Sequence, residues 1–294
     1  MNWRWRRKDE DRPLYADVRG TGAETVVFLA GLGGTTRYWA SRVAPLEADY
    51  RVVLIDLLVF GESPKPWTTY SVERHVAALR RALEPLGPVS LVGHSLGALL
   101  AVAYAARYPG DIKKLTVIGM PVFGSQARAY RYLRHGPVRG GIVYTNVLLT
   151  MIACLITRRL LGWLLPYVLR NVPREVAEDL VKHTWRSSTS SLWEVVYRYD
   201  AAGDLARLPE HIGVLIIHGS DDLMAPLPPI ERLAAAYPQW RVWVARGVDH
   251  HPLLREPTAC LRMLRQHVSG DRAAGTIRPS AQEPESTIKE NPCD

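Results

Sequence analysis

The sequence GHSLG at residues 93–97 joins an apolar run at residues 89–92 to a helix-like run at residues 98–107. A serine in this setting is typical of a nucleophile elbow, a tight turn that lifts Ser95 clear of both elements. A serine hydroxyl must be exposed beside a general base before it can attack a carbonyl carbon. Gly93 and Gly97 leave room for the turn, because a side chain at either position would collide with the neighbouring strand or helix. The pattern therefore predicts that Ser95 is a nucleophile.

Five further apolar runs accompany the run before Ser95. They lie at residues 26–29, 52–55, 115–118, 214–217 and 242–244. Their apolar residues are continuous rather than alternating, which indicates buried parallel strands. Helical periodicity appears between strands at residues 72–86 and 96–107. This alternation predicts an α/β fold with a mostly parallel central sheet, helices on both faces, and ligand sites at the carboxyl ends of the strands.

Candidate acids and bases follow two of the later predicted strands. Along the chain, the order of the candidate residues is serine, aspartate, histidine. Asp221 and Asp222 follow the run at 214–217, and His250 and His251 follow the last run. An imidazole can take the serine proton and return it to the leaving group, while a carboxylate orients the ring. Each residue alone is more often a turn former or a structural histidine. Their joint occurrence at strand ends favours the catalytic interpretation.

A glycine-rich turn at residues 30–34 follows the first apolar run. Gly31 and Gly33 allow the backbone of this turn to approach a ligand closely. An oxyanion hole needs two fixed backbone donors, and the natural pair is the amide of Leu32 with the amide of Leu96. A plain glycine-rich turn and a phosphate loop are the alternatives. The phosphate loop is disfavoured, because neither the P-loop pattern nor the complete dinucleotide fingerprint is present.

Taken together, these motifs resemble those of the α/β-hydrolase superfamily, in the subgroup of esterases, lipases and C–C bond hydrolases that carry a helical cap. The resemblance covers most of the chain and includes Asp56 with the FGES sequence that follows it. It implies that Asp222 rather than Asp221 is the acid, and that His250 rather than His251 is the base. Relatives that release halide or hydrolyse epoxides use an aspartate at the elbow, and the serine excludes them.

Three positions depart from the family pattern. The family usually has His-Gly at the oxyanion turn, so Ala30 removes a supporting side-chain hydrogen bond without displacing the backbone donors. A glycine is usual at the positions of Val59 and Asp249. If the backbone at either position needs a positive φ angle, Val59 or Asp249 tolerates it poorly, and the loop conformation differs from that of the family.

The 294-residue length suits one catalytic domain with an insertion. We expect the core at residues 1–120 and 208–268, a helical cap at 121–207, and a disordered tail at 269–294. Such a cap would close over Ser95, exclude water and supply an apolar wall for the substrate. Its aromatic residues could equally form its own core: Tyr130, Tyr132, Trp163, Tyr167, Trp185, Trp193 and Tyr197.

Residues 140–157 carry no charge over 18 positions, which is the lower bound for a membrane span. A span here would place Ser95 and His250 on opposite sides of the bilayer. A buried cap helix, or an apolar helix that touches a membrane surface, fits better. The net charge of +8 and the basic residues 3–8 are compatible with such peripheral contact, although a solvated basic surface is the simpler interpretation. The arginines near this helix are Arg128, Arg131, Arg134, Arg158, Arg159 and Arg170.

Other partners and cofactors find no support in the sequence. The basic residues are dispersed, and no nucleic-acid-binding motif appears. The charged N-terminus lacks the apolar region of a secretory signal, so a cytoplasmic location is expected. Three cysteines far apart predict no disulfide framework, and the adjacent pair His250 and His251 lacks a spaced third ligand, so we expect neither metal nor cofactor.

These observations predict a cofactor-free serine hydrolase that cleaves carboxylic esters of a fairly apolar small molecule through an acyl-enzyme. Acyl transfer, or hydrolysis of a thioester or a C–C bond, could use the same three residues. A non-catalytic binding protein of the same fold is the alternative from another class, because fold alone does not fix function. The oligomeric state is not determined by these patterns.

Overall fold

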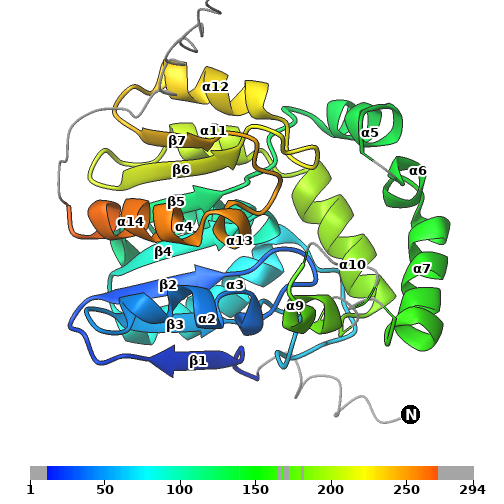
Figure 1. Cartoon of the computed structure of the whole chain (residues 1–294), viewed down its shortest axis with the longest axis horizontal. Coiled ribbons are helices and arrows are strands. Elements are labelled where there is room, and N and C mark those ends of the chain that lie inside the picture. The colour runs from blue at the N-terminus through cyan, green and yellow to red at the C-terminus, as the bar shows by residue number, and fades with distance from the viewer. Residues whose placement is uncertain (1–11, 139, 165–166, 168–171, 180–181, 271–294) are drawn as a thin grey trace, which may run out of the picture.

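A single seven-stranded sheet organises the chain in the computed structural model, which describes residues 12–138, 140–164, 167, 172–179 and 182–270. The strand order is β1-β3-β2-β4-β5-β6-β7, and only β1 is antiparallel to its neighbour (Figure 1). The strands are β1 (Ala16–Arg19), β2 (Thr25–Leu29), β3 (Arg51–Ile55), β4 (Val89–His94), β5 (Ile112–Ile118), β6 (Gly213–Gly219) and β7 (Arg241–Ala245). All six predicted strands are present, and the α/β fold with a mostly parallel sheet is confirmed.

Both faces of the central strands are buried, which explains their continuous apolar sequences. In β2, Val27 and Leu29 pack into one core cluster, whereas Val26 and Phe28 pack into a second cluster on the opposite face. Successive side chains of a strand point to opposite faces, so a strand covered on both sides must be apolar at every position. The edge strand β1 does not share this constraint, because its residues alternate between exposed and half-buried.

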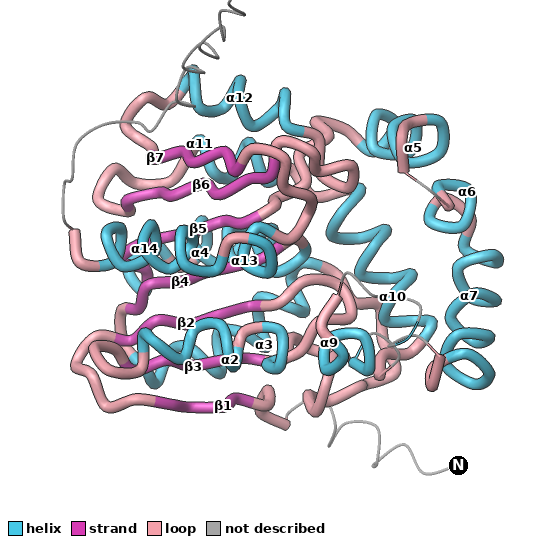
Figure 2. Tube along the Cα trace, viewed as in Figure 1, coloured by secondary structure: helices cyan, strands magenta, loops and turns pink. Residues whose placement is uncertain are grey.

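Helices cover the two faces of the sheet as separate layers (Figure 2). One layer contains α2 (Ala40–Val43), α13 (Pro252–Arg255) and α14 (Pro257–Val268); the other contains α3 (Val72–Leu83), α4 (Leu96–Arg107), α11 (Ala201–Ala206) and α12 (Leu227–Ala236). Short 3-10 turns complete the loops: η1 (Thr36–Tyr38), η2 (Ala44–Leu46), η3 (Glu84–Leu86) and η4 (Pro109–Asp111). The helix predicted at residues 72–86 thus ends as α3 at Leu83 and continues only as a 3-10 turn.

The stretch between β5 and β6, here called the β5–β6 segment, is built from helices and loops where the structure describes it. Its helices are α5 (Gln126–His135), α6 (Gly141–Tyr144), α7 (Val147–Ile156), the π-helix η5 (Thr157–Leu161), α9 (Arg174–Asp179), α10 (Trp185–Ser191), the π-helix η6 (Leu192–Tyr197) and α11. Figure 1 shows α5, α6, α7 and α10 beyond the carboxyl ends of the strands, where the site was expected. The last helix, α11, instead packs on α4 against the sheet.

The uncharged stretch at residues 140–157 forms two separate helices, α6 and α7. Thr145 caps the end of α6, and Asn146 caps the start of α7. Most of α7 is exposed, with Thr150 as its buried residue, so the expectation of a buried cap helix is wrong. Within the described ranges no helix is both long enough and apolar enough to cross a membrane. The expected disordered tail lies outside the described residues beyond Gly270, as do residues 3–8 and Arg170.

Candidate active site

Ser95 lies at the sharp turn between β4 and α4, with φ of 53° and ψ of −116°. A Cβ at Gly93 would meet the carbonyl of Gly97, and a Cβ at Gly97 would meet the carbonyl of Leu29 at the end of β2. Both flanking glycines are therefore required by close backbone contacts. A positive φ is unusual for serine and is typical of residues held in strained functional turns.

A chain of hydrogen bonds connects Ser95 to His250 and then to Asp222. The Ser95 hydroxyl lies 2.9 Å from Nε2 of His250, and Nδ1 of His250 lies 2.7 Å from Oδ2 of Asp222. Because a carboxylate only accepts, Nδ1 carries the proton and Nε2 is left to accept the proton of the serine hydroxyl. The structure thus brings together three residues from β4, β6 and β7 loops that are up to 155 positions apart.

The carboxylate of Asp222 is buried and fully occupied. Its Oδ1 accepts hydrogen bonds from the amides of Met224 (2.8 Å) and Ala225 (2.9 Å), while Oδ2 faces His250. Burial acts to raise the pKa of Asp222, but the hydrogen bond and charge of His250 and the Ala225 amide outweigh it and lower the pKa. The side chain is therefore charged at neutral pH and can stabilise an imidazolium.

Neighbouring Asp221 and Asp249 have other partners. Asp221 is exposed and accepts a hydrogen bond from Ser220 (2.7 Å). Asp249 pairs with Arg255 at 2.5 Å and accepts from the amide of His251 at 3.0 Å. Neither carboxylate has a hydrogen bond to His250, so the geometry favours Asp222.

Two more histidines, His94 and His251, line the back of the site. The ring of His94 stacks on Tyr38 with 4.9 Å between centroids, and its Nε2 donates to the carbonyl of His250 (2.8 Å). Burial, followed by the nearby His250 and His251, holds the pKa of His94 well below its usual range. Burial likewise lowers the pKa of His251 to about 4. Both rings are neutral, and His94 fixes the loop that carries His250.

The glycine-rich turn of residues 30–34 faces the elbow. A Cβ at Gly31 would lie 3.1 Å from both Nδ1 of His94 and Cβ of Ser95, so this turn approaches the serine closely. Gly33 has a φ of 74°, which favours glycine. Leu32 and Leu96 line one pocket together with Ser95 and His250. Within the described residues, neither the Leu32 amide nor the Leu96 amide donates a hydrogen bond, so both are available to a ligand.

A buried carboxylate, Asp56, holds η1, the 3-10 turn that follows the glycine-rich turn. Its two oxygens accept hydrogen bonds from the amides of Thr36 (2.6 Å) and Glu62 (2.8 Å). Gly61 has a φ of 50°, and a Cβ there would meet the Asp56 carboxylate. Val59, which stands where the family usually has glycine, has a positive φ of 75°. Asp249, at the other such position, is not among the described residues with a positive φ.

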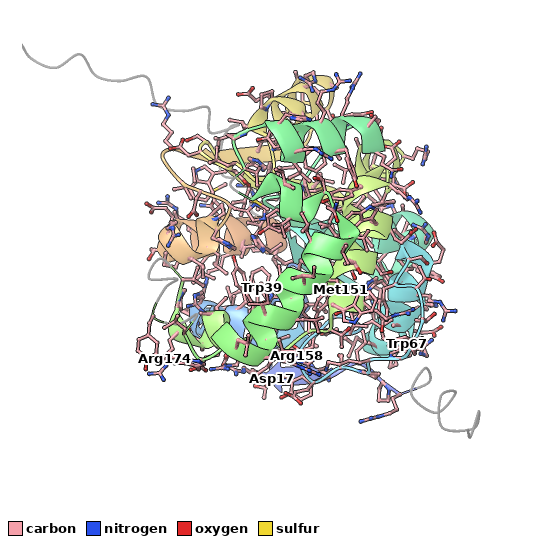
Figure 3. All side chains as sticks on the ribbon, turned by 90° about the vertical axis from the view of Figure 1, so that its right-hand side faces the viewer. Asp17, Trp39, Trp67, Met151, Arg158 and Arg174 are labelled. Atoms are coloured by element: carbon pink, nitrogen blue, oxygen red, sulfur yellow. The ribbon has the colours of Figure 1, made fainter. Side chains whose placement is uncertain are left out.

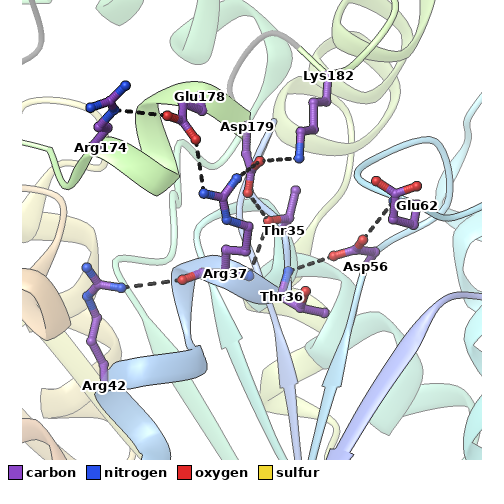
Figure 4. Close-up of polar contacts among 10 residues, drawn as sticks. All are labelled: Thr35, Thr36, Arg37, Arg42, Asp56, Glu62, Arg174, Glu178, Asp179 and Lys182. Carbon is purple, nitrogen blue, oxygen red and sulfur yellow. Dashed lines mark hydrogen bonds and ion pairs between the residues drawn. The ribbon is translucent and has the colours of Figure 1, made fainter. Parts of the chain in front are cut away.

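A second buried carboxylate, Asp179 of α9, holds η1 and its N-cap residue from the side of the β5–β6 segment (Figure 4). It accepts hydrogen bonds from the Thr35 hydroxyl, from Arg37 at 2.9 Å and from Lys182 at 2.7 Å. Glu178 on the same helix binds Arg37 and Arg174. The role of Asp179 has no signal in the sequence, because no local pattern links it to Thr35 and Arg37, which lie more than 140 positions earlier in the chain.

The pocket beside Ser95 has mostly apolar walls from the β5–β6 segment. Leu133, Tyr144, Leu192, Val196 and Tyr197 line it, along with Pro121, Phe123 and Met224. Tyr130, Trp193 and Tyr197 also stack edge to face on one another, with centroids 5.2 to 6.4 Å apart. These aromatic residues therefore form an internal core of the segment, and Tyr197 forms part of the pocket wall as well. Trp163 and Tyr167 do neither, since both are exposed.

Metal binding has no obvious place in the described part of the chain, where no three His, Cys, Asp or Glu side chains are grouped to hold an ion. His94, His250 and His251 lie close together, but their ring nitrogens already face the His250 carbonyl, Ser95, Asp222 and Tyr38. Cys154 and Cys260 are free thiols, and Cys293 lies outside the described residues.

The fold and the site together define the class of protein. A family model for the alpha/beta hydrolase fold matches residues 24–257, so the chain belongs to this family. Among curated proteins, it is 27% identical over 257 residues to "Probable lysophospholipase BODYGUARD 1" of Arabidopsis thaliana, covering 77% of this chain. The match spans only 55% of that relative's length.

Two further comparisons agree with this family assignment. The chain is 29% identical to RutD of Escherichia coli strain SMS-3-5, which is named for carbamate hydrolysis, over 83% of this chain and 88% of RutD. A thermophilic esterase from Thermogutta terrifontis shares the fold, with a TM-score of 0.68 and 20% identity over 87% of this chain and 93% of the esterase. At 20% identity, the comparison with the esterase shows a shared fold.

Proposed function

We propose that this chain is a serine hydrolase that cleaves carboxylic esters of a fairly apolar substrate. The observation that carries the proposal is the unbroken hydrogen-bonded series of Ser95, His250 and Asp222 at the base of an apolar pocket. The related esterase fold and the lysophospholipase name of the Arabidopsis relative support an ester, and the RutD name makes a carbamate the chemically nearest alternative.

The reaction would proceed through an acyl-enzyme. Ser95 Oγ attacks the ester carbonyl carbon while its proton passes to Nε2 of His250, and Asp222 stabilises the imidazolium. The amides of Leu32 and Leu96 bind the oxyanion, and each such donor contributes about 3 kcal/mol to transition-state stabilisation. The intermediate expels the alcohol, which takes the proton from His250. Water then repeats the sequence and releases the acid.

The expected cap role of residues 121–207 belongs to this proposal. Helices α5 and α6 and the π-helix η6 supply the apolar wall, so the substrate group next to the carbonyl would contact Leu133, Tyr144 and Tyr197. Excluding water from this space strengthens the hydrogen bonds to the oxyanion. A cap that keeps water out would also favour acyl transfer, which product analysis with added alcohols would detect.

The test is covalent labelling with a fluorophosphonate probe combined with turnover of p-nitrophenyl esters. We expect one label per chain, on Ser95, and we expect Ser95→Ala to reduce turnover by about 10⁴-fold or more. Ser220→Ala, at another strand end, is the matched control and should keep full activity. Labelling at a different residue, or equal activity of Ser95→Ala and the parent chain, would refute the mechanism. Turnover of a p-nitrophenyl carbamate in preference to the ester would reassign the substrate class.

A further inference from the structure

An exposed apolar surface, here called the α7 face, lies on the outer side of the β5–β6 segment. Of the fourteen large apolar side chains that are exposed in the described part of the chain, ten lie between residues 142 and 167. Steps of three and four residues place most of them along one side of α7 and its continuation. The α7 face consists of Leu148, Ile152, Leu155, Ile156, Leu160 and Trp163.

This face has no partner within the described chain. The other side of α7 packs on α10 and α6, and Figure 3 shows α7 in front of the rest of the molecule, with Met151 and Arg158 marked along it. Trp163 is 73% exposed and Leu160 is 64% exposed. Soluble monomers rarely leave a contiguous apolar surface of this extent open to water, and such surfaces mark binding sites.

The stretch of sequence that contains the α7 face is strongly basic. Residues 112–174 contain ten basic residues and no aspartate or glutamate. Eight of the ten are arginines within 121–174, and the 29 basic residues elsewhere in the chain match its 29 acidic residues. Residues 121–174, which include α7, therefore carry a net charge equal to the +8 of the whole chain. Arg158 and Arg159 are exposed and directly follow α7, and α5 exposes Arg128, Arg131 and Arg134.

From this combination we propose that the α7 face binds the surface of a lipid bilayer rich in anionic phospholipids. Apolar side chains would enter the boundary between headgroups and acyl chains, while the arginines pair with phosphates. Trp163 and Tyr167 are amphipathic aromatic residues that favour this boundary. A second copy of the chain fits less well, because a symmetric contact through this face would oppose the same unbalanced arginines.

Docking in this orientation would also supply substrate. The pocket beside Ser95 is walled by Leu133, Tyr144 and Tyr197, which come from helices in the same segment as α7. An ester embedded in a bilayer, with one acyl chain free to enter the pocket, is therefore the substrate class that this surface selects. This last step depends on the proposed ester hydrolysis, whereas binding of the α7 face to lipid does not.

Vesicle flotation with the Ser95→Ala chain tests the surface without lipid turnover. Vesicles of phosphatidylcholine alone are compared with vesicles that contain about one third phosphatidylglycerol. We expect at least tenfold tighter binding to the anionic vesicles and weaker binding as salt is raised. Equal or absent binding to the two compositions would overturn the proposal.

Two pairs of variants locate the contact. Trp163→Ala should weaken vesicle binding about tenfold, whereas Trp67→Ala, which removes a similarly exposed tryptophan (62%) stacked on Arg186, should leave it unchanged. Each arginine near the bilayer strengthens binding about fivefold, so Arg158→Glu combined with Arg159→Glu should weaken binding by about 25-fold or more. The control pair Arg246→Glu with Arg262→Glu makes the same change in net charge elsewhere and should have a much smaller effect.

Other outcomes separate the alternatives. Equal losses in both arginine pairs would show that net charge alone drives binding, and the α7 face would not be the site. Dimerisation that Trp163→Ala abolishes, without any vesicle binding, would assign the face to a second copy instead. The Ser95→Ala chain could bind anionic vesicles while the unsubstituted chain neither reacts with fluorophosphonate nor cleaves soluble esters. That result would support the docking surface and refute the hydrolase proposal.

Discussion

Helices α9 and α7 belong to the same segment between β5 and β6, yet they contact their surroundings in opposite ways. The Asp179 carboxylate of α9 is 1% exposed and is held by Thr35, Arg37 and Lys182, so α9 is fixed to η1, which directly follows the glycine-rich turn. Helix α7 packs through one side only and turns apolar residues outward. The two helices thus differ: α9 is anchored beside the site through a buried carboxylate, whereas α7 leaves apolar side chains open to water.

The largest effect should follow from breaking the fixed contact. Asp179→Ala leaves Thr35, Arg37 and Lys182 without their shared acceptor at a buried position. Loss of one member of a buried pair costs about 3 to 5 kcal/mol, and we expect about 2 kcal/mol here because Arg37 and Lys182 are about 40% exposed. Since η1 directly follows the glycine-rich turn that carries Leu32, kcat for p-nitrophenyl esters should fall about tenfold while KM stays nearly constant.

Glu178→Ala is the matched control for this prediction. Glu178 lies on the same helix and pairs with Arg37 and Arg174, but its side chain is 38% exposed, against 1% for Asp179. Urea unfolding and ester kinetics of this variant should equal those of the parent chain. If Asp179→Ala loses stability but retains full kcat, Asp179 is a structural anchor without influence on the glycine-rich turn.

An intermediate effect is expected when acid weakens the sheet core. Burial, followed by the nearby Lys114 and Arg241, lowers the pKa of His267 to about 4, while its Nε2 donates to the carbonyl of Gly213. Between this value and about 6.5, the unfolded chain binds a proton that the folded chain does not. The free energy of unfolding should therefore fall as pH drops through this window, by about 1 kcal/mol per pH unit for this residue.

The His267→Gln variant should show a shallower loss of stability between pH 6.5 and about 4, measured by urea unfolding at several pH values. His211→Gln, which replaces an exposed histidine, is the control and should follow the parent curve. An unchanged slope in His267→Gln would mean that this histidine does not contribute to the acid sensitivity.

The smallest effect is expected on α7 itself. Leu148→Ser combined with Ile152→Ser removes two outward-facing apolar side chains and should change the free energy of unfolding by less than about 1 kcal/mol in the absence of lipid. Thermal or urea unfolding of the purified chain provides the measurement. A loss several times larger would show that these side chains are packed against something in the free protein, and the contrast with α9 would fail.

Much of the fold could be predicted because buried parallel strands and elbow geometry leave local signals. The six apolar runs, the helix at 96–107 and the two glycines around Ser95 all follow from short-range constraints. Strand β1 was missed because its four residues, ADVR, alternate in exposure and include two charges. An edge strand of this kind owes its position to pairing with β3, which a local pattern does not reveal.

The candidate site was predictable in its residue types, while several of its contacts were not. Family spacing singled out Asp222 and His250, and the structure places His250 within hydrogen-bonding distance of both Ser95 and Asp222. The neutral state of His94 and His251 arises from burial beside other rings, which depends on tertiary packing. Asp179 likewise becomes recognisable only when α9 is placed against the turn at Thr35.

The positive φ of Ser95 sets a limit on how stable this protein can be. A non-glycine residue in such a conformation costs about 1 to 3 kcal/mol, and the surrounding packing of β2, β4 and α4 must overcome that cost every time the chain folds. Glycine at this position would relieve the strain and abolish the hydroxyl. The chain thus retains a strained backbone conformation that positions the Ser95 hydroxyl. Selection for thermal stability alone would not be expected to preserve this turn.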